Sequence, residues 1–193
     1  ALCLPADIRA AVRRAVTGTP RLVDVCRLNN RLFLNASGAG LDARVAASSL
    51  RMSATFGRMA YLLAGIANVL PPPKWRVKVR WEGDDYDGPV TLMTVGNGHR
   101  TGGSYYLTPM ADVADGLMDV TILRASSTRQ LAFDLPAMLR ENHRPLSNSI
   151  AFRSSWCEVT SDEPLPVHMD GELEPSESTL LRYEVLPGAL QVV

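Results

Sequence analysis

The chain has 193 residues, of which 46% are hydrophobic and 21% are charged, and its 20 basic side chains are balanced by 20 acidic ones. This is the composition of an ordinary globular domain, and a chain of this length buries ~70% of its unfolded surface. The lack of a basic excess argues against nucleic acid as a partner.

The cysteine spacing and the hydropathy of the sequence indicate the cellular compartment in which the protein is expected. The cysteines Cys3, Cys26 and Cys157 are widely spaced and provide neither a disulfide framework nor metal-ligand spacing, which favours a reducing, cytoplasmic compartment. No apolar run reaches the ~20 residues of a membrane-spanning helix, and the N-terminal segment lacks the pattern of a signal peptide. Because the chain starts without Met inside a loop-like segment, we expect it to be part of a longer protein.

The first part of the chain predicts helices and short strands. Residues 7–17 have helical spacing, and strands are expected over residues 22–28 and 31–35, joined by a turn at Asn29-Asn30. The glycine-rich residues 37–40 predict a bend, and residues 40–50 are expected to be partly helical. The strongest helix is predicted over residues 52–70, before a run of prolines. Its apolar stripe is typical of a core helix and would also suit the wall of an acyl-chain pocket.

The rest of the chain is rich in strands. Trp and Val alternate with Arg and Lys over residues 75–81, which predicts a half-buried strand with a basic outer face. Further strands are expected over residues 89–95, 116–123, 149–160, 165–173, 180–186 and 189–193, and a helix is expected over residues 128–140. We therefore predict an α+β, mainly β fold: a β-sandwich domain with two or three added helices, spanning residues 1–193.

Two Asp-Gly pairs receive different interpretations. Asp87-Gly88 lies between two predicted strands and indicates an ordinary turn. Asp170-Gly171 interrupts the strand predicted over residues 165–173, where a glycine marks a bulge or the close approach of a ligand. If that strand stays extended, Asp170 and Glu172 point to the same side, joined by His168, and one carboxylate could act as a general base. The alternative is a solvated acidic edge.

Two other segments contain the residue types of a ligand site. Asp112 and Asp115 precede a predicted strand, and a turn there could present both carboxylates and a backbone carbonyl to Mg²⁺; the alternative is a pair of surface turn acids. The loop over residues 96–104 contains Gly98, Gly102 and Gly103, which let backbone N–H groups approach phosphates, although a flexible loop has the same composition.

The order of these segments resembles the diacylglycerol kinase catalytic-domain family, and the likeness runs through nearly the whole chain. The matching segments are FLNASGAGLDA at residues 33–43, VGNG at residues 95–98 with Gly102-Gly103, PMA at residues 109–111 with DGLMDV at residues 115–120, and VHMDGE at residues 167–172 with LPGAL at residues 186–190. Two positions depart from the family pattern, Ser104 and Thr108, and both concern the contacts of the glycine loop.

The resemblance implies the second, β-sandwich domain of a two-domain lipid kinase. The family's N-terminal nucleotide-binding domain, with its Gly-Gly-Asp-Gly-Thr motif, has no match in this chain. The resemblance further implies ATP-dependent phosphorylation of a lipid hydroxyl, with Asp170 or Glu172 as the general base. It implies Mg²⁺ on Asp115, the carbonyl of Leu117 and Asp112, and a glycine loop that faces the domain cleft.

Several properties stay open. The expected partners are a lipid substrate, a membrane surface contacted peripherally from the cytoplasm, and the missing ATP-binding domain. A homodimer is compatible with the sequence, which does not identify the lipid. A non-enzymatic β-sandwich binding module is one alternative function, and a relative that phosphorylates a soluble nucleotide such as NAD is another.

Overall fold

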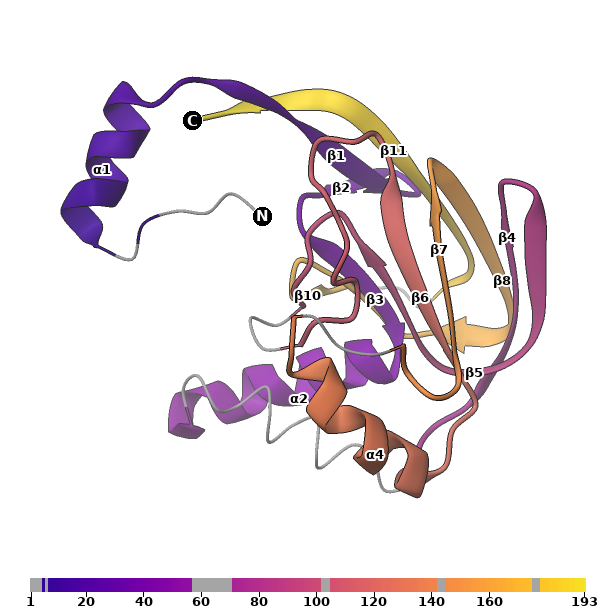
Figure 1. Ribbon diagram of the computed structural model, residues 1–193. Helices are drawn as coiled ribbons and strands as arrows, with labels where there is room; N and C mark the ends of the chain where they lie inside the picture. The colour runs from indigo at the N-terminus through magenta and orange to yellow at the C-terminus, as the bar shows by residue number, and fades with distance from the viewer. Residues whose placement is uncertain (1–4, 6, 57–70, 102–104, 142–144, 175–177) are drawn as a thin grey trace.

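A computed structural model describes residues 5, 7–56, 71–101, 105–141, 145–174 and 178–193, with side chains in α2 described as far as residue 48. The chain forms a curled antiparallel sheet with helices at its margins (Figure 1). Its helices are α1 (Ile8–Thr17), α2 (Leu41–Phe56) and α4 (Thr128–Met138). The first strands are β1 (Arg21–Leu28), β2 (Arg31–Phe33), β3 (Ala36–Gly40), β4 (Trp75–Trp81), β5 (Asp84–Gly96) and β6 (Met118–Arg124). The remaining strands are β7 (Ser149–Ser154), β8 (Trp156–Leu165), β9 (Val167–Met169), β10 (Glu172–Leu173) and β11 (Ser178–Val192).

The long strand β5 joins the two parts of the sheet. The main path has the order β10-β9-β3-β5-β4-β8-β11-β1-β2, and β6 and β7 extend it from β5. The first half of β5 pairs with β4, whereas its second half lies between β3 and β6. The predicted mainly β, sandwich-like architecture with added helices is confirmed.

The alternation in β4 explains how the main core forms. Trp75, Val77, Val79 and Trp81 are buried, and the basic side chains between them are exposed, as predicted. Trp81 stacks on Phe152 with ring centroids 3.9 Å apart. Burial of large apolar side chains inside the curled sheet supplies most of the stabilisation. A second cluster, which includes Leu41, Leu92, Leu123, Leu131 and Met138, lies where α2 and α4 cover the sheet.

Two local predictions were wrong for the same reason. Residues 37–40 belong to the buried strand β3, paired on both sides, and not to a bend. Asp87-Gly88 lies within β5 opposite β4, and the turn falls at residues 82–83, where Gly83 has a φ of 81°. In both places strand pairing overrode the turn tendency of glycine, because glycine without a side chain fits crowded strands as well as turns.

The observed helices lie close to the predicted positions, but their bounds differ from the predicted ones. α2 begins directly after β3, and of the helix predicted over residues 52–70 the part after Phe56 lies outside the described residues. α1 is capped by the Asp7 carboxylate, which accepts a hydrogen bond from the Ala10 N–H at 2.8 Å. None of its residues is buried, and it stands apart from the sheet in Figure 1. Within the described part of the chain, no helix combines the length and apolar character needed to cross a membrane.

Candidate functional site

The Asp170-Gly171 pair forms the tip of a tight hairpin. β9 and β10 pair antiparallel with Met169 opposite Glu172, and both tip residues have a positive φ, 51° for Asp170 and 92° for Gly171. This is the backbone conformation that Asp-Gly favours in two-residue hairpins. The prediction that Asp170-Gly171 interrupts a continuing strand is therefore wrong, and Asp170 and Glu172 do not share one side of an extended strand.

The Asp170 carboxylate is held by backbone amides. Its Oδ2 accepts a hydrogen bond from the Leu34 N–H at 2.7 Å, and its Oδ1 accepts bonds from the N–H groups of Asn35 and Ala36 at 2.8 and 3.0 Å. The Asp170 N–H in turn donates to the Ala36 carbonyl at 2.8 Å. The hairpin tip is thus fixed against the segment that leads into β3.

The other acidic and basic candidates near the tip lie apart from it. The Glu172 side chain is exposed, and among the described residues it has no hydrogen-bond or ion-pair partner. His168 is 2% exposed and faces Asp42 of α2, with 3.4 Å between Nε2 and Oδ2. The expected group of Asp170, Glu172 and His168 is not assembled as one cluster.

Asn35 connects the hairpin tip to the glycine loop. Its carbonyl accepts hydrogen bonds from the N–H groups of Asn97 and Gly98 at 2.9 and 2.8 Å, and its Nδ2 donates to the Arg100 carbonyl at 2.9 Å. A Cβ at Gly98 would lie 2.3 Å from Asn35 Oδ1, so a larger residue would displace the Asn35 side chain. Since the Gly98 N–H is already bonded, its contact with a phosphate stays a prediction. Gly102 and Gly103 lie outside the described residues.

Asp24 and Asn97 connect the same loop to the predicted metal turn. Asn97 is buried, and its Nδ2 donates to the carbonyls of Asp24 and Leu34, both at 2.9 Å. The buried Asp24 carboxylate accepts hydrogen bonds from the N–H groups of Gly116 and Gly188, both at 2.7 Å. We name Asp24, Asn35, Asn97 and Asp170, with the backbone groups they bind, the rim network. It ties together the three segments that the sequence singled out.

The predicted metal ligands have oxygen chemistry suited to Mg²⁺, but their side chains already have partners. Asp112 Oδ1 accepts a hydrogen bond from the Ala114 N–H at 3.2 Å, and Asp115 Oδ1 accepts one from the Leu117 N–H at 3.0 Å. Asp115 Oδ2 forms an ion pair with Arg153. A cation there would compete with this guanidinium, so the ligand set Asp112, Asp115 and Leu117 stays a prediction.

Arg153 also lies beside a second carboxylate. Its Nε is 3.3 Å from Asp119 Oδ2. Burial nonetheless raises the pKa of Asp119 to about 6, because a charged carboxylate loses hydration there. This carboxylate lies next to an open hollow of about 470 Å³ that also contacts Met110, Leu146 and Phe152.

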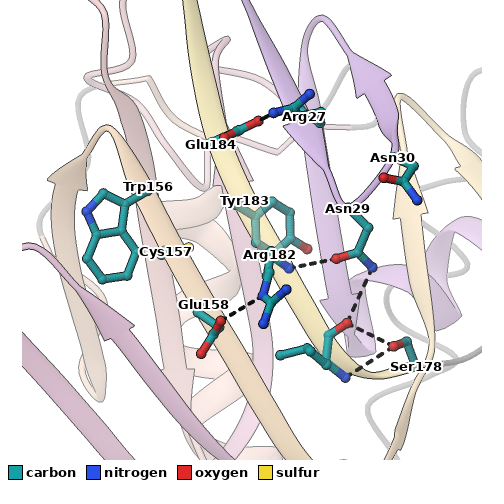
Figure 2. A pocket seen from close by; sticks show the side chains of 11 residues that line it. Arg27, Asn29, Asn30, Trp156, Cys157, Glu158, Ser178, Arg182, Tyr183 and Glu184 are labelled. Carbon is teal, nitrogen blue, oxygen red and sulfur yellow. Dashed lines mark hydrogen bonds and ion pairs between the residues drawn. The ribbon is translucent and has the colours of Figure 1, made fainter.

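A different kind of polar surface lies over β1, β11 and β8. A hollow of about 710 Å³ opens there, and none of the predicted site residues lines it (Figure 2). Charged side chains in and beside this hollow pair with each other across adjacent strands. We name this group the outer charged face: Arg27 with Glu184, and Arg182 and Arg80 with Glu158.

The sequence reasoning missed the residues that hold the site together. Asp24 could have been recognised from the sequence as a functional candidate, because it is the one acidic residue in the apolar run of the first strand. Asn35 and Asn97 lie inside the recognised motifs, but nothing in the local sequence distinguishes them from ordinary turn residues. Their roles depend on partners more than 60 residues away, such as Arg100 for Asn35 and Asp24 for Asn97.

The family model and the curated proteins that match this chain indicate the same family. A family model described as "YegS C-terminal NAD kinase beta sandwich-like domain" matches residues 35–193. A "Probable lipid kinase YegS-like" from Shewanella frigidimarina is 32% identical over 191 residues, covering 96% of this chain and 60% of that protein. A protein of the same name from Pseudomonas aeruginosa strain PAO1 is 32% identical over 184 residues, covering 95% and 60%.

The fold has counterparts among solved structures. A diacylglycerol kinase structure from Bacillus anthracis str. Sterne aligns with a TM-score of 0.69 and 19% identity, covering 97% of this chain and 59% of that one. An NAD kinase from Archaeoglobus fulgidus, solved with ATP, aligns with a TM-score of 0.50 and 11% identity, covering 96% and 60%. At these identities the likeness establishes the fold alone. The chain spans about 60% of the length of the curated relatives it matches.

Proposed function

Because the chain belongs to the YegS C-terminal NAD kinase β-sandwich-like domain family, we propose that it forms the acceptor side of an ATP-dependent lipid kinase. In this proposal a lipid hydroxyl, of diacylglycerol or a related lipid, receives the γ-phosphate of ATP. The printed names of the curated relatives support the class of enzyme. The observation that carries the proposal is the rim network, which joins the Asp170 hairpin, the glycine loop and the residue 112–117 turn.

The proposed chemistry needs one base and accurate positioning. As the acceptor oxygen forms its bond to phosphorus, its proton passes to a carboxylate, and the bond between phosphorus and the ADP leaving oxygen breaks. Asp170 and Glu172 are the candidate bases. Backbone amides hold Asp170 through three hydrogen bonds, and a carboxylate has about four acceptor positions, so one remains for a hydroxyl. Glu172 is exposed and free to turn toward an acceptor.

ATP and Mg²⁺ belong to the same proposal. The loop with Gly98, Gly102 and Gly103 would lie toward the phosphates. Asp112, Asp115 and the carbonyl of Leu117 would hold Mg²⁺, which would neutralise negative charge nearby when bound. The oxygen donors fit this ion, and Asp115 would exchange its Arg153 partner for it.

A further domain and a membrane surface are the proposed partners. The curated relatives extend well beyond the matched region, and we propose that ATP is held mainly by such an additional domain. The apolar stripe of α1 supports a protein contact, since Ile8, Val12 and Val16 are 58–79% exposed on one face. The lipid acceptor would be reached at the cytoplasmic membrane face. A homodimer is compatible with this arrangement.

The experiment is a phosphorylation assay on the full-length protein. Labelled ATP is offered with a panel of diacylglycerol, a sphingoid base and phosphatidylglycerol in mixed micelles, and with NAD. We expect transfer to a lipid, and a loss of ~10²–10⁴-fold in kcat for the Asp170→Asn or Glu172→Gln variant, whichever removes the base. Asp87→Asn is the matched control, because it alters an Asp-Gly pair in β5, outside the rim network.

The outcomes separate the alternatives. Transfer to NAD but to no lipid would replace the acceptor class while keeping the kinase. Absence of transfer to every acceptor would favour the non-enzymatic binding module. Full activity in both carboxamide variants would mean that this domain supplies no base and contributes binding alone.

A further inference from the structure

A buried polar cluster lies directly behind the Asp170 hairpin. His168 in β9, Gly38 in β3 and Thr94 in β5 occupy one row across the three strands. The Asp42 side chain, from the first turn of α2, lies over Gly38 in the middle of this row. It accepts a hydrogen bond from Thr94 Oγ1 at 2.9 Å and lies 3.4 Å from His168 Nε2, both through Oδ2.

The interior here tolerates a carboxylate because the surroundings favour negative charge. Asp42 is 4% exposed, and it belongs to the first turn of a helix, where the backbone dipoles attract an acidic side chain. Its effect reaches Tyr105, whose pKa is raised to about 12 by burial and, secondly, by the Asp42 charge. Asp42 therefore has both a helix terminus and neighbouring polar side chains to hold it in place.

His168 depends on Asp42 for a polar contact. Its ring is 2% exposed, and neither ring nitrogen reaches a hydrogen-bond partner within the part of the chain that the structure describes. Asp42 Oδ2 is the charged group that faces Nε2. A buried polar ring is costly without such a neighbour, so its position is defined by Asp42.

Gly38 makes the meeting of these two side chains possible. A Cβ at this position would lie 2.1 Å from Asp42 Oδ2 and 2.5 Å from His168 Nε2, which is closer than atoms can approach. A larger residue would push the carboxylate and the ring away from each other. The glycine inside β3 thus creates the space in which α2 and β9 make contact.

We propose that Asp42 and His168 are positioning residues, which hold β9 from the α2 side so that the Asp170 hairpin keeps its productive orientation. The inference rests on the proposed function for its kinetic consequence. His168 is two residues before Asp170 on the same hairpin, and the Ser37 hydroxyl donates to the His168 carbonyl at 2.8 Å. The hairpin is thereby fixed at two levels: His168 inside, and the Asp170 carboxylate at the tip.

The hairpin is short and only one of its strands is paired with the rest of the sheet. β9 has 3 residues and pairs with β3, whereas β10 has 2 residues and is the terminal strand of the main order. A short terminal strand opens readily, because few backbone hydrogen bonds must break. A misplacement of ~1 Å at a reacting group can lower a rate ~10²-fold. An internal contact to α2 is therefore expected to affect kcat.

The first test compares steady-state kinetics of full-length variants. His168→Leu and Asp42→Ala are expected to lower kcat ~10–100-fold and to change KM for ATP and lipid by less than ~3-fold, since neither buried residue is proposed to contact a substrate. His168→Gln, which returns a polar group near the Nε2 position, should recover part of the rate. Val159→Ala is the matched control, because it removes buried volume from β8 and has no part in this contact.

The second test does not require activity. Hydrogen exchange of the Asp170 N–H, which donates to the Ala36 carbonyl, reports directly on the hairpin. We expect its exchange to accelerate at least ~10-fold in His168→Leu but not in Val159→Ala at equal global stability. Equal exchange in the two variants overturns the proposal, as does an unchanged kcat in a folded His168→Leu protein. If the wild-type protein phosphorylates no acceptor, the proposed function fails, and the exchange measurement still decides the positioning role.

Discussion

The rim network and the outer charged face are both rich in polar side chains, but these side chains have different kinds of partners. In the rim network, carboxylates and amides are bonded to backbone groups from distant parts of the chain, as Asp24 is to Gly188. On the outer charged face, Glu158 and Glu184 pair with arginine side chains of neighbouring strands (Figure 2). Backbone groups cannot move without moving the fold, whereas exposed side chains exchange partners with water. Of these two regions, the rim network is therefore the better suited to hold side chains in fixed positions.

The largest expected effect separates the rim network from an exposed ion pair, Arg76 with Asp87, by stability. Asp24→Ala leaves the N–H groups of Gly116 and Gly188 without their acceptor, so the free energy of unfolding should fall by ~2–4 kcal/mol in urea denaturation. Asp87→Ala, which removes an exposed partner of Arg76, should change it by less than ~0.5 kcal/mol. Equal losses in the two variants would remove the distinction.

Two glycines with the same backbone requirement allow a comparison in which stability is matched and activity differs. Gly171 and Gly83 both have a positive φ, 92° and 81°, and an added Cβ would meet no atom within 4 Å at either position. Alanine should therefore cost ~1–2 kcal/mol of stability at each, through the backbone alone. Only Gly171→Ala should also reduce phosphorylation by the full-length protein, since Gly171 shapes the Asp170 hairpin. An equal loss of activity in Gly83→Ala would contradict this.

A smaller, pH-dependent effect is expected on the outer charged face. Hydrogen bonds from Arg182 and Arg80 lower the pKa of Glu158. A carboxylate with a lowered folded pKa adds stability above its ordinary pKa, and this is lost as the pH falls through the folded value. The free energy of unfolding of the wild-type protein should exceed that of Glu158→Gln by ~0.5–1 kcal/mol near neutral pH. The two proteins should be equally stable at acid pH or in ~1 M NaCl. A difference that persists in salt would show that the pair is shielded from solvent.

The smallest effect concerns the pair between Arg76 and Asp87. The atoms Nη2 and Oδ1 are 2.9 Å apart, but the side chains are 63% and 53% exposed. A double-mutant cycle with alanine at both positions should give an interaction energy below ~0.5 kcal/mol. A value above ~1 kcal/mol would mean that the exposed strand pairs contribute to stability like those of the rim.

The sequence predicted the parts of the fold that depend on local pattern. The alternation of β4, the helix α4 and the turn at Asn29-Asn30 follow from neighbouring residues, and each lies near its predicted place. β3 was missed because pairing with β5 and β9 decides its conformation, and those partners are far away in sequence. The strands predicted over residues 180–186 and 189–193 are one strand, β11, in which Gly188 at a φ of 59° is accommodated.

The candidate site was predictable in its motifs and not in its geometry. The spacing of Asp170 and Glu172 suggested a shared side, but hairpin closure between β9 and β10 changes the direction of the chain between them. His168 seemed to belong with these acids, yet its apolar neighbours place it in the interior with Asp42. Such contacts depend on tertiary packing, which no local spacing encodes.

The pairing of β1 with β11 has a consequence for synthesis of the protein. The Arg182 N–H donates to Asn29 Oδ1 across 153 residues of chain. While a ribosome makes the intervening segment, β1 and β2 have no β11 to pair with, and an unpaired apolar strand readily associates with other chains. Closure of so long a loop also slows folding. Synthesis of β11 is therefore the step at which β1 gains its partner and the sheet can close.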